Sequence, residues 1–191
     1  MASLPVTRYT PEQYLEMERA AETKSEYYHG EIFAMAGASE DHITIVFNIG
    51  RAIGNQILDR PCRGYASEMK VQVGAAYYYP DFVAVCGDRD FLDKRKDALM
   101  NPNVIVEVLS PSTEAYDRGL KWLEYRRTAS LREYVLIAQD AMRVELYVRQ
   151  DGDHWLLSIL ADPDAILSLE SIGCAIPLRD IYRNIDFPEA P

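Results

Sequence analysis

The chain has 191 residues, 48% of them hydrophobic, which fits one folded domain with a sizeable core. Its formal charge of −10, from 20 basic and 30 acidic residues, argues against loose electrostatic binding of nucleic acid. It leaves room for a nuclease with a local basic groove. No run of about 18 apolar residues occurs, so we expect no membrane span.

The N-terminus and the cysteines favour a cytoplasmic location. Residues 1–5 lack the basic head and the apolar core of a secretory signal. Cys62, Cys86 and Cys174 are odd in number, lie far apart and match no zinc spacing. We therefore expect reduced, mostly buried thiols in a cytoplasmic protein.

The first part of the chain predicts two helices around a hairpin. Thr10-Pro11 is an N-cap followed by proline at the first helical position, so a helix should run to about Ala21. Residues 25–35 predict a hairpin that turns at His29-Gly30. Ser39 then caps a long helix to about residue 58, whose apolar positions recur at helical spacing.

The rest of the chain alternates strands with one helix and a charged loop. We expect a single domain over residues 1–191, with its core at about 25–150. The fold class is α/β (α+β): a central mixed sheet flanked by helices, with an extra N-terminal hairpin and extra C-terminal strands. The predicted strands cover residues 65–73, 78–86, 104–109, 133–138, 143–149 and 154–160, the helix 114–127, and more strand and a last helical turn follow to 182.

Two acids lie in or beside predicted strands, where a charge has no structural reason to be. Asp81 follows Pro80, and Glu107 lies inside the apolar run 104–109. A carboxylate among valines costs several kcal/mol unless a cation compensates it. Two such acids on neighbouring strands indicate a shared divalent metal, Mg²⁺ or Mn²⁺, which takes oxygen ligands and keeps several waters. The alternative for Asp81 is an ordinary strand-start aspartate. Apolar neighbours on both sides make Glu107 harder to explain structurally.

These residue types are the ones that phosphodiester hydrolysis needs. The reaction requires an activated water, a Lewis acid at the phosphate and a cation for the pentacovalent state. Asp81 and Glu107 would be catalytic and metal-binding, with the carbonyl of Val108 as a further oxygen donor. Leu109 stands where a lysine is expected, two positions after the glutamate.

Lys121 is the substitute for that lysine. It shares one helix face with Asp117 and Tyr125, because the three are spaced four residues apart. A helix packed on the sheet could bring Lys121 over the acids. The alternative is an ordinary surface ion pair with Asp117, which stabilises little.

Weaker candidates surround this group. Glu31 follows a tight turn, and His42 lies near the start of the long helix; both, like Asp117, are accessory candidates, although a lone histidine there is more often a satisfied semi-buried residue. Residues 117–132 carry five cations against two anions. This run is either a solvated helix face or a nucleic-acid contact, with Arg118, Arg126 and Arg127 as the candidates.

Five strings of the chain are characteristic: Tyr-His-Gly-Glu-Ile-Phe-Ala-Met-Ala-Gly-Ala-Ser-Glu-Asp-His at 28–42, Tyr-Tyr-Pro-Asp at 78–81, Val-Glu-Val-Leu-Ser-Pro-Ser-Thr at 106–113, Tyr-Asp-Arg-Gly-Leu-Lys at 116–121 and Leu-Arg-Glu-Tyr-Val-Leu-Ile at 131–137. Together they resemble the Uma-type family of restriction endonucleases, which belongs to the PD-(D/E)XK nuclease superfamily. The resemblance runs from about residue 10 to 187.

The resemblance implies a restriction-endonuclease-like core with a central four-stranded mixed sheet flanked by helices. It also implies roles: Asp81 as the motif's aspartate, Glu107 as its acid and Lys121 as a lysine that has migrated to the following helix. Glu31 and His42 match positions that the family tends to keep. Superfamily nucleases often work as homodimers, with one site for each strand.

Two functions follow. The first is a Mg²⁺-dependent endonuclease that hydrolyses phosphodiester bonds in DNA. The alternative is a catalytically silent nuclease fold that acts in nucleic-acid or protein binding. The acidic total charge and the missing in-strand lysine favour the alternative. Chemically competent residues at all three candidate catalytic positions favour the enzyme.

Overall fold

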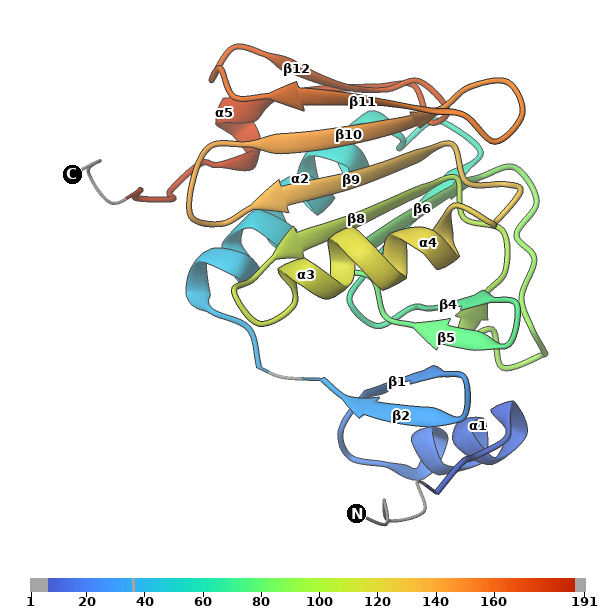
Figure 1. Cartoon of the computed structure of the whole chain (residues 1–191). Coiled ribbons are helices and arrows are strands. Elements are labelled where there is room, and N and C mark those ends of the chain that lie inside the picture. Colours follow the sequence, from blue (N-terminus) through green and yellow to red (C-terminus); the bar gives the residue numbers. More distant parts are fainter. Residues whose placement is uncertain (1–6, 36, 188–191) are drawn as a thin grey trace.

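A six-stranded mixed sheet forms the centre of the molecule (Figure 1). The computed structural model describes residues 7–35 and 37–187. The strand order is β11-β10-β9-β8-β6-β3. The pair β8–β9 is parallel and the other neighbours are antiparallel. The strands are β3 (Cys62–Ala66), β6 (Phe82–Cys86), β8 (Val104–Leu109), β9 (Glu133–Ala138), β10 (Val144–Arg149) and β11 (Trp155–Leu160).

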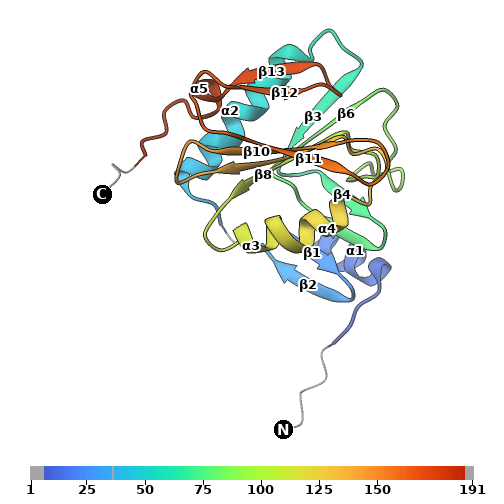
Figure 2. The same ribbon diagram turned by 45° about the horizontal axis from the view of Figure 1, so that its top comes forward.

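Helices flank this sheet, and the predicted fold class is confirmed, with six strands where the resemblance implied four. On one face lie α2 (Glu40–Gln56), the hairpin β12 (Ile166–Leu169) with β13 (Cys174–Pro177), and α5 (Leu178–Ile181) (Figure 2). On the other face lies a helical segment of α3 (Glu114–Tyr116), the π-helical turn η1 (Asp117–Lys121) and α4 (Trp122–Tyr125).

The central strand β8 is apolar because both of its faces are buried. Val104, Val106 and Val108 point into the core under α2. Ile105 and Leu109 point into the core under the helical segment. Each such buried side chain contributes about 1.5–3 kcal/mol relative to exposure. Because side chains alternate along a strand, Glu107 faces the helical segment together with Ile105 and Leu109.

A second, five-stranded sheet lies on the side of the helical segment, in the order β2-β1-β5-β4-β7. Its Tyr27 and Tyr77 pack with Tyr14 of α1 in a small third core. The elements are α1 (Pro11–Ala20), β1 (Ser25–Tyr28), β2 (Glu31–Ala34), β4 (Lys70–Val73), β5 (Ala76–Tyr78) and β7 (Ala98–Leu99).

The predicted N-terminal helices and hairpin are confirmed. The Thr10 side chain accepts a hydrogen bond from the Gln13 main chain, and Gln13 completes a capping box. Ser39 caps α2 in the same way, through the amide of His42. His29 and Gly30 both adopt positive φ at the turn between β1 and β2. The expectation about a secretory signal concerns residues 1–5, which lie outside the described residues.

Two predicted strands were wrong, because each is two strands in different sheets. Residues 65–73 divide into β3 and β4, and Ser67, with φ at +49°, turns the chain between the sheets. Residues 78–86 divide into β5 and β6 at Pro80, which has no amide hydrogen to give to a ladder. Apolar alternation continues across both breaks, so the pattern alone reads as one strand.

The expectation of three reduced thiols was also wrong. Cys62 and Cys86 form a disulfide between β3 and β6. The antiparallel register places the two residues directly opposite each other, which their sequence spacing does not reveal. Cys174 is a buried free thiol, and burial raises its pKa. Among the described residues, no helix has the length and apolar character needed to cross a membrane.

Candidate functional site

The structure brings Asp81 and Glu107 together. β6 pairs with β8 so that Phe82 lies opposite Val106. This register places Asp81, one residue before β6, beside Glu107. The main-chain nitrogen of Asp81 lies 3.4 Å from Oε2 of Glu107. The two predicted ligands therefore lie at the junction between the two sheets, where Pro80 ends one ladder and Phe82 begins the next.

Asp81 is held by a histidine and by the sheet. Its Oδ1 lies 2.9 Å from Nε2 of His42, on the first turn of α2. Its Oδ2 accepts a 2.7 Å hydrogen bond from the amide of Val108. The Asp81 side chain is 18% exposed, so one side of it still reaches solvent. The predicted accessory residue His42 is thus in contact with the candidate ligand.

Glu107 is closed off from solvent, with its side chain 3% exposed. Its Oε1 accepts hydrogen bonds from Nζ of Lys121 at 3.2 Å and from the hydroxyl of Tyr125 at 3.1 Å. Burial raises the pKa of Glu107 well above its usual value; the nearby Asp117 and other carboxylates add to this, and Lys121 opposes it. Glu107 therefore holds a proton more readily than an exposed glutamate does.

Lys121 lies among three carboxylates in a buried position. Nζ is 3.0 Å from Glu26, 3.2 Å from Glu107 and 3.4 Å from Asp117. Burial alone would lower the pKa of Lys121, but the three carboxylates raise it well above its usual value. Lys121 and Asp117 share the π-helical turn η1, a form that is rare and frequently found at functional sites. The raised pKa favours the charged form of Lys121.

Glu26 is the site residue that sequence reasoning missed. It lies on β1 and is 5% exposed. Its Oε1 accepts a 3.0 Å hydrogen bond from the amide of Tyr79 and also contacts Lys121. Glu26 could have been found in the same way as Glu107, because it too is an acid within a predicted strand, here a short one rich in tyrosine. In contrast, the predicted accessory Glu31 lies at the start of β2 and takes no part in the described contacts of the site.

The site has more negative than positive charge. We define the acid–lysine cluster as Glu26, Asp81, Glu107, Asp117 and Lys121. Four carboxylates against one lysine leave a net charge of −3 when all are ionised. Oδ1 of Asp117 is buried and accepts no well-aligned hydrogen bond from the described residues. An excess of buried negative charge is compensated by bound protons or by a cation.

The cluster fits a hard divalent cation in its donor chemistry. In the described part of the chain, no three acidic, histidine or cysteine side chains already stand at metal-binding spacing. Mg²⁺ does not need such a cage, because one or two carboxylates and several waters suffice. Each carboxylate oxygen has two lone pairs, so those of Asp81 and Glu107 can accept hydrogen bonds and still bind an ion.

The three arginines predicted to contact nucleic acid are engaged within the protein. Arg118 contacts Glu114 and Glu145, Arg127 contacts Glu124, and Arg126 contacts the main-chain carbonyl of Asp153.

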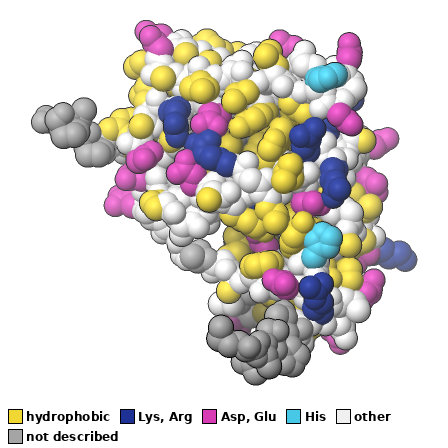
Figure 3. Space-filling view, viewed as in Figure 1, with side chains coloured by type: hydrophobic (Ala, Val, Ile, Leu, Met, Phe, Trp, Pro, Cys, Tyr) yellow, Lys and Arg dark blue, Asp and Glu magenta, His cyan; other side chains and the backbone are white. Residues whose placement is uncertain are grey.

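In Figure 3, hydrophobic side chains gather over the middle of the visible face, with basic and acidic side chains interspersed around them. This face is therefore neither a uniform basic groove nor uniformly acidic.

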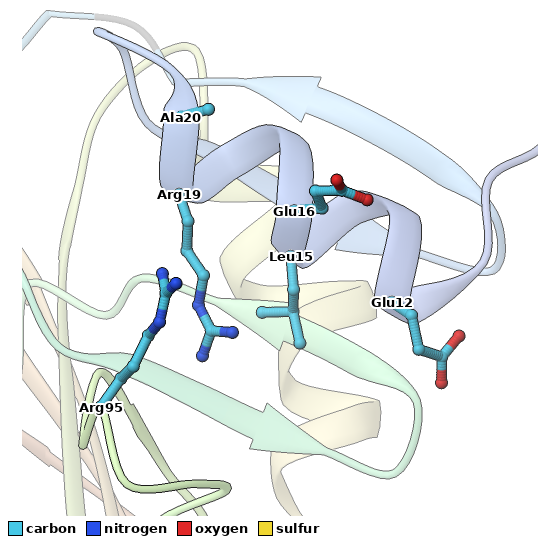
Figure 4. A pocket seen from close by; sticks show the side chains of 6 residues that line it. All are labelled: Glu12, Leu15, Glu16, Arg19, Ala20 and Arg95. Carbon is cyan, nitrogen blue, oxygen red and sulfur yellow. The ribbon is translucent and has the colours of Figure 1, made fainter.

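An open pocket of about 450 Å³ lies beside α1, and Figure 4 shows the side chains that line it. Arg19, one of its lining residues, forms ion pairs with Asp93 and Asp97 at 2.8 and 2.7 Å. Its charge is thereby neutralised. The residues that line the pocket are Glu12, Leu15, Glu16, Arg19, Ala20 and Arg95, and the acid–lysine cluster contributes none of them.

The raised pKa of Glu107 predicts how stability changes with pH. The folded protein binds a proton on Glu107 more tightly than the unfolded chain does, so this contribution is fully present below the ordinary pKa of 4.5 and is lost as pH rises through the folded value. We expect wild type to lose stability relative to Glu107→Gln between pH 4.5 and 8 without divalent ions. Urea denaturation across this range measures the difference. A relative gain by wild type would contradict the assignment.

One family model covers most of the chain. The Uma2 family model, described as "Putative restriction endonuclease", matches residues 11–179. The chain belongs to the Uma2 family. "Uncharacterized protein slr1290" of Synechocystis sp. is 35% identical over 187 residues, covering 97% of each chain. "Uncharacterized protein sll1609" of the same organism is 37% identical over 158 residues, or 82% of this chain and 89% of that one.

A solved structure shares the fold. It is described as a "putative nuclease belonging to DUF820" from Anabaena variabilis ATCC 29413, and it covers 91% of this chain and 97% of its own. The TM-score is 0.76 and the sequence identity is 20%. Membership of the Uma2 family confirms the resemblance seen in the five strings, and it makes the chain a nuclease-like protein. The roles of individual residues stay predictions.

Proposed function

We propose that this Uma2 member is an endonuclease that hydrolyses phosphodiester bonds in DNA with Mg²⁺ or Mn²⁺. The observation that carries this proposal is the charge of the acid–lysine cluster. Three carboxylates surround the single lysine, and the fourth, that of Asp81, belongs to the residue beside Glu107. Structural ion pairs are normally balanced, since an uncompensated buried charge costs several kcal/mol. An excess of carboxylates at a sheet junction in a nuclease family is what a divalent cation would balance.

Asp81 and Glu107 are the residues that would hold this cation. Oε2 of Glu107 is the less engaged of its two oxygens, because Lys121 and Tyr125 both donate to Oε1. Asp81 offers its solvent-facing side. When bound, Mg²⁺ supplies a Lewis acid for the phosphate and lowers the pKa of water. The carbonyl of Val108 stays a predicted further donor.

The protein's own side chains position the reacting groups. His42 and the amide of Val108 hold the two oxygens of Asp81, which fixes the plane of that carboxylate. Lys121 keeps its proton, so it acts as a positive charge toward the phosphate and not as a base. Glu26 and Asp117 hold the ammonium group beside Glu107. The open side of Asp81 is where a phosphate would approach.

DNA and a second copy of the chain are the proposed partners. Arg126 and Arg127 are the arginines that we propose to contact the phosphate backbone, since neither is held by two carboxylates as Arg118 is. A homodimer would place one site on each strand of a duplex. Light scattering on the purified protein tests the dimer.

A silent binding module is the second candidate. The burial of Glu107 and Lys121, whose side chains are 3% and 7% exposed, favours this binding module. A buried ion-pair network can be kept for conformational specificity alone. The two candidates differ in whether phosphodiester bonds are cut.

The test is cleavage of supercoiled plasmid and of single-stranded DNA with Mg²⁺ or Mn²⁺. Wild type is compared with Asp81→Ala and with Glu107→Ala. We expect metal-dependent nicking that both substitutions abolish. No nicking by wild type above the two variants, across metals and substrates, would favour the binding module.

A further inference from the structure

A second group of buried charges lies outside the acid–lysine cluster, between α1 and β4. Nζ of Lys70 forms ion pairs with Glu18 at 2.7 Å and with Asp97 at 3.2 Å. The side chains of Lys70 and Glu18 are only 5% and 6% exposed. Buried ion pairs are weak contributors to stability, and apolar residues of similar volume often stabilise as well or better. Packing α1 on the sheet does not by itself require these charges.

Tyr79 connects this group to the proposed site. Its buried hydroxyl donates a hydrogen bond to Glu18 and accepts one from Nζ of Lys70 at 3.1 Å. Its main-chain amide donates to Glu26, a member of the acid–lysine cluster. Tyr79 is therefore fixed at its side-chain tip and at its main chain, by different elements.

Tyr79 is also two residues before Asp81, at the point where the chain leaves one sheet for the other. Pro80 between them has a fixed φ and no amide hydrogen. The 79–81 segment therefore has few main-chain hydrogen bonds of its own. The carbonyl of Asp81 accepts from Ser67, and the amide of Tyr79 donates to Glu26. Tyr79 and Asp81 are thus joined through a single residue whose backbone conformation is restricted.

We propose that Tyr79 is a positioning residue, whose hydroxyl, held by Glu18 and Lys70, sets the place of the Asp81 carboxylate. This inference rests on the proposed function for the role of Asp81. The geometry itself is independent of it. Desolvation raises the pKa of the Tyr79 hydroxyl, and its hydrogen bond to Glu18 adds to this, so the group remains a donor. The N-terminal helix thereby becomes part of the site although it contributes no residue to the acid–lysine cluster.

The test compares Tyr79→Phe with a matched control, Tyr27→Phe. Tyr27 is 3% exposed, and its hydroxyl donates a 2.8 Å hydrogen bond to the carbonyl of Tyr9 in the same part of the protein. Each substitution removes one hydroxyl and keeps the ring. The readout is hydrogen exchange of the Val108 amide, which donates to Asp81 and so reports on that carboxylate.

We expect Val108 exchange to be about tenfold faster in Tyr79→Phe, the factor that corresponds to a lost hydrogen bond of about 1.4 kcal/mol to a charged group. Tyr27→Phe should change it less than about twofold, since it breaks no contact with the 79–81 segment. The Kd for Mn²⁺ should rise about tenfold in Tyr79→Phe for the same reason. Glu18→Gln keeps an acceptor for the hydroxyl, so it should retain wild-type exchange at Val108.

The outcomes separate the two proposals. Unchanged Val108 exchange in Tyr79→Phe, or an equal change in Tyr27→Phe, would overturn the positioning role. Wild type that binds no Mn²⁺ would overturn the proposed function, while Val108 exchange would still decide the role of Tyr79. If Tyr79→Phe fails to fold, Glu18→Ala removes the same hydrogen bond from the other side and is judged by the same readout.

Discussion

Replacing Lys121 with methionine is expected to lower the free energy of unfolding at pH 8 by about 3–5 kcal/mol, the range for removing one partner of a buried ion pair. Methionine fills a similar volume, so the loss does not come from a cavity. It comes from Glu26, Glu107 and Asp117, which lie within 3.0–3.4 Å of Nζ and would be left without their cation. Urea denaturation measures the loss.

The same substitution should cost less at pH 5. Burial raises the pKa of both Glu107 and Asp117, so these groups can take up protons and remove the repulsion. Lys24→Met is the control, because Lys24 pairs with Glu68 in a surface bridge whose acid is 81% exposed. That change should cost no more than about 1 kcal/mol. If Lys121→Met matched the control at pH 8, Lys121 would not be the buried counter-charge of these three carboxylates.

Replacing Glu26 with alanine is expected to cost about 2–4 kcal/mol. The buried amide of Tyr79 would lose its acceptor, at about 1–3 kcal/mol, and Lys121 would lose its nearest carboxylate. Thermal and urea unfolding measure the change. Glu31→Ala is the matched control on the same hairpin, and it should stay within about 0.5 kcal/mol.

Comparing Glu26→Ala with Glu31→Ala also tests two assignments: Glu31, which the sequence predicted as a site residue, and Glu26, which the structure places in the acid–lysine cluster. A larger cost for Glu31→Ala than for Glu26→Ala would show that the described contacts of Glu26 do not stabilise the protein. It would return Glu31 to the site as the sequence predicted. Cleavage assays on the same two variants show whether either acid also affects turnover.

The sequence could predict acids where they conflict with their surroundings. Asp81 beside Pro80 and Glu107 among valines stand out, and the structure does bring them together. Lys121 could be predicted from its spacing to Asp117, although the π-helical turn that carries both could not. The helix starts at Thr10 and Ser39 followed directly from capping chemistry.

The features that the sequence did not predict depend on pairing between residues that are distant in the chain. The disulfide requires Cys62 to lie opposite Cys86, which only the register of β3 and β6 decides. Glu26 joins the cluster because β1 pairs with β5, and that pair is antiparallel through Tyr27 and Tyr77. Neither pairing leaves a signal within a short window of sequence. The sequence of the hairpin predicted its turn, but not that its strand β1 pairs with β5.

Binding of Mn²⁺, followed by the loss of its free-ion paramagnetic resonance signal, tests the central claim most directly. The claim is that the acid–lysine cluster carries its excess of carboxylates in order to hold a divalent cation. We expect wild type to bind one Mn²⁺ per chain in competition with Mg²⁺, and Asp81→Asn and Glu107→Gln each to lose this binding. Wild type that leaves the signal unchanged, or variants that bind as well as wild type, would contradict the claim.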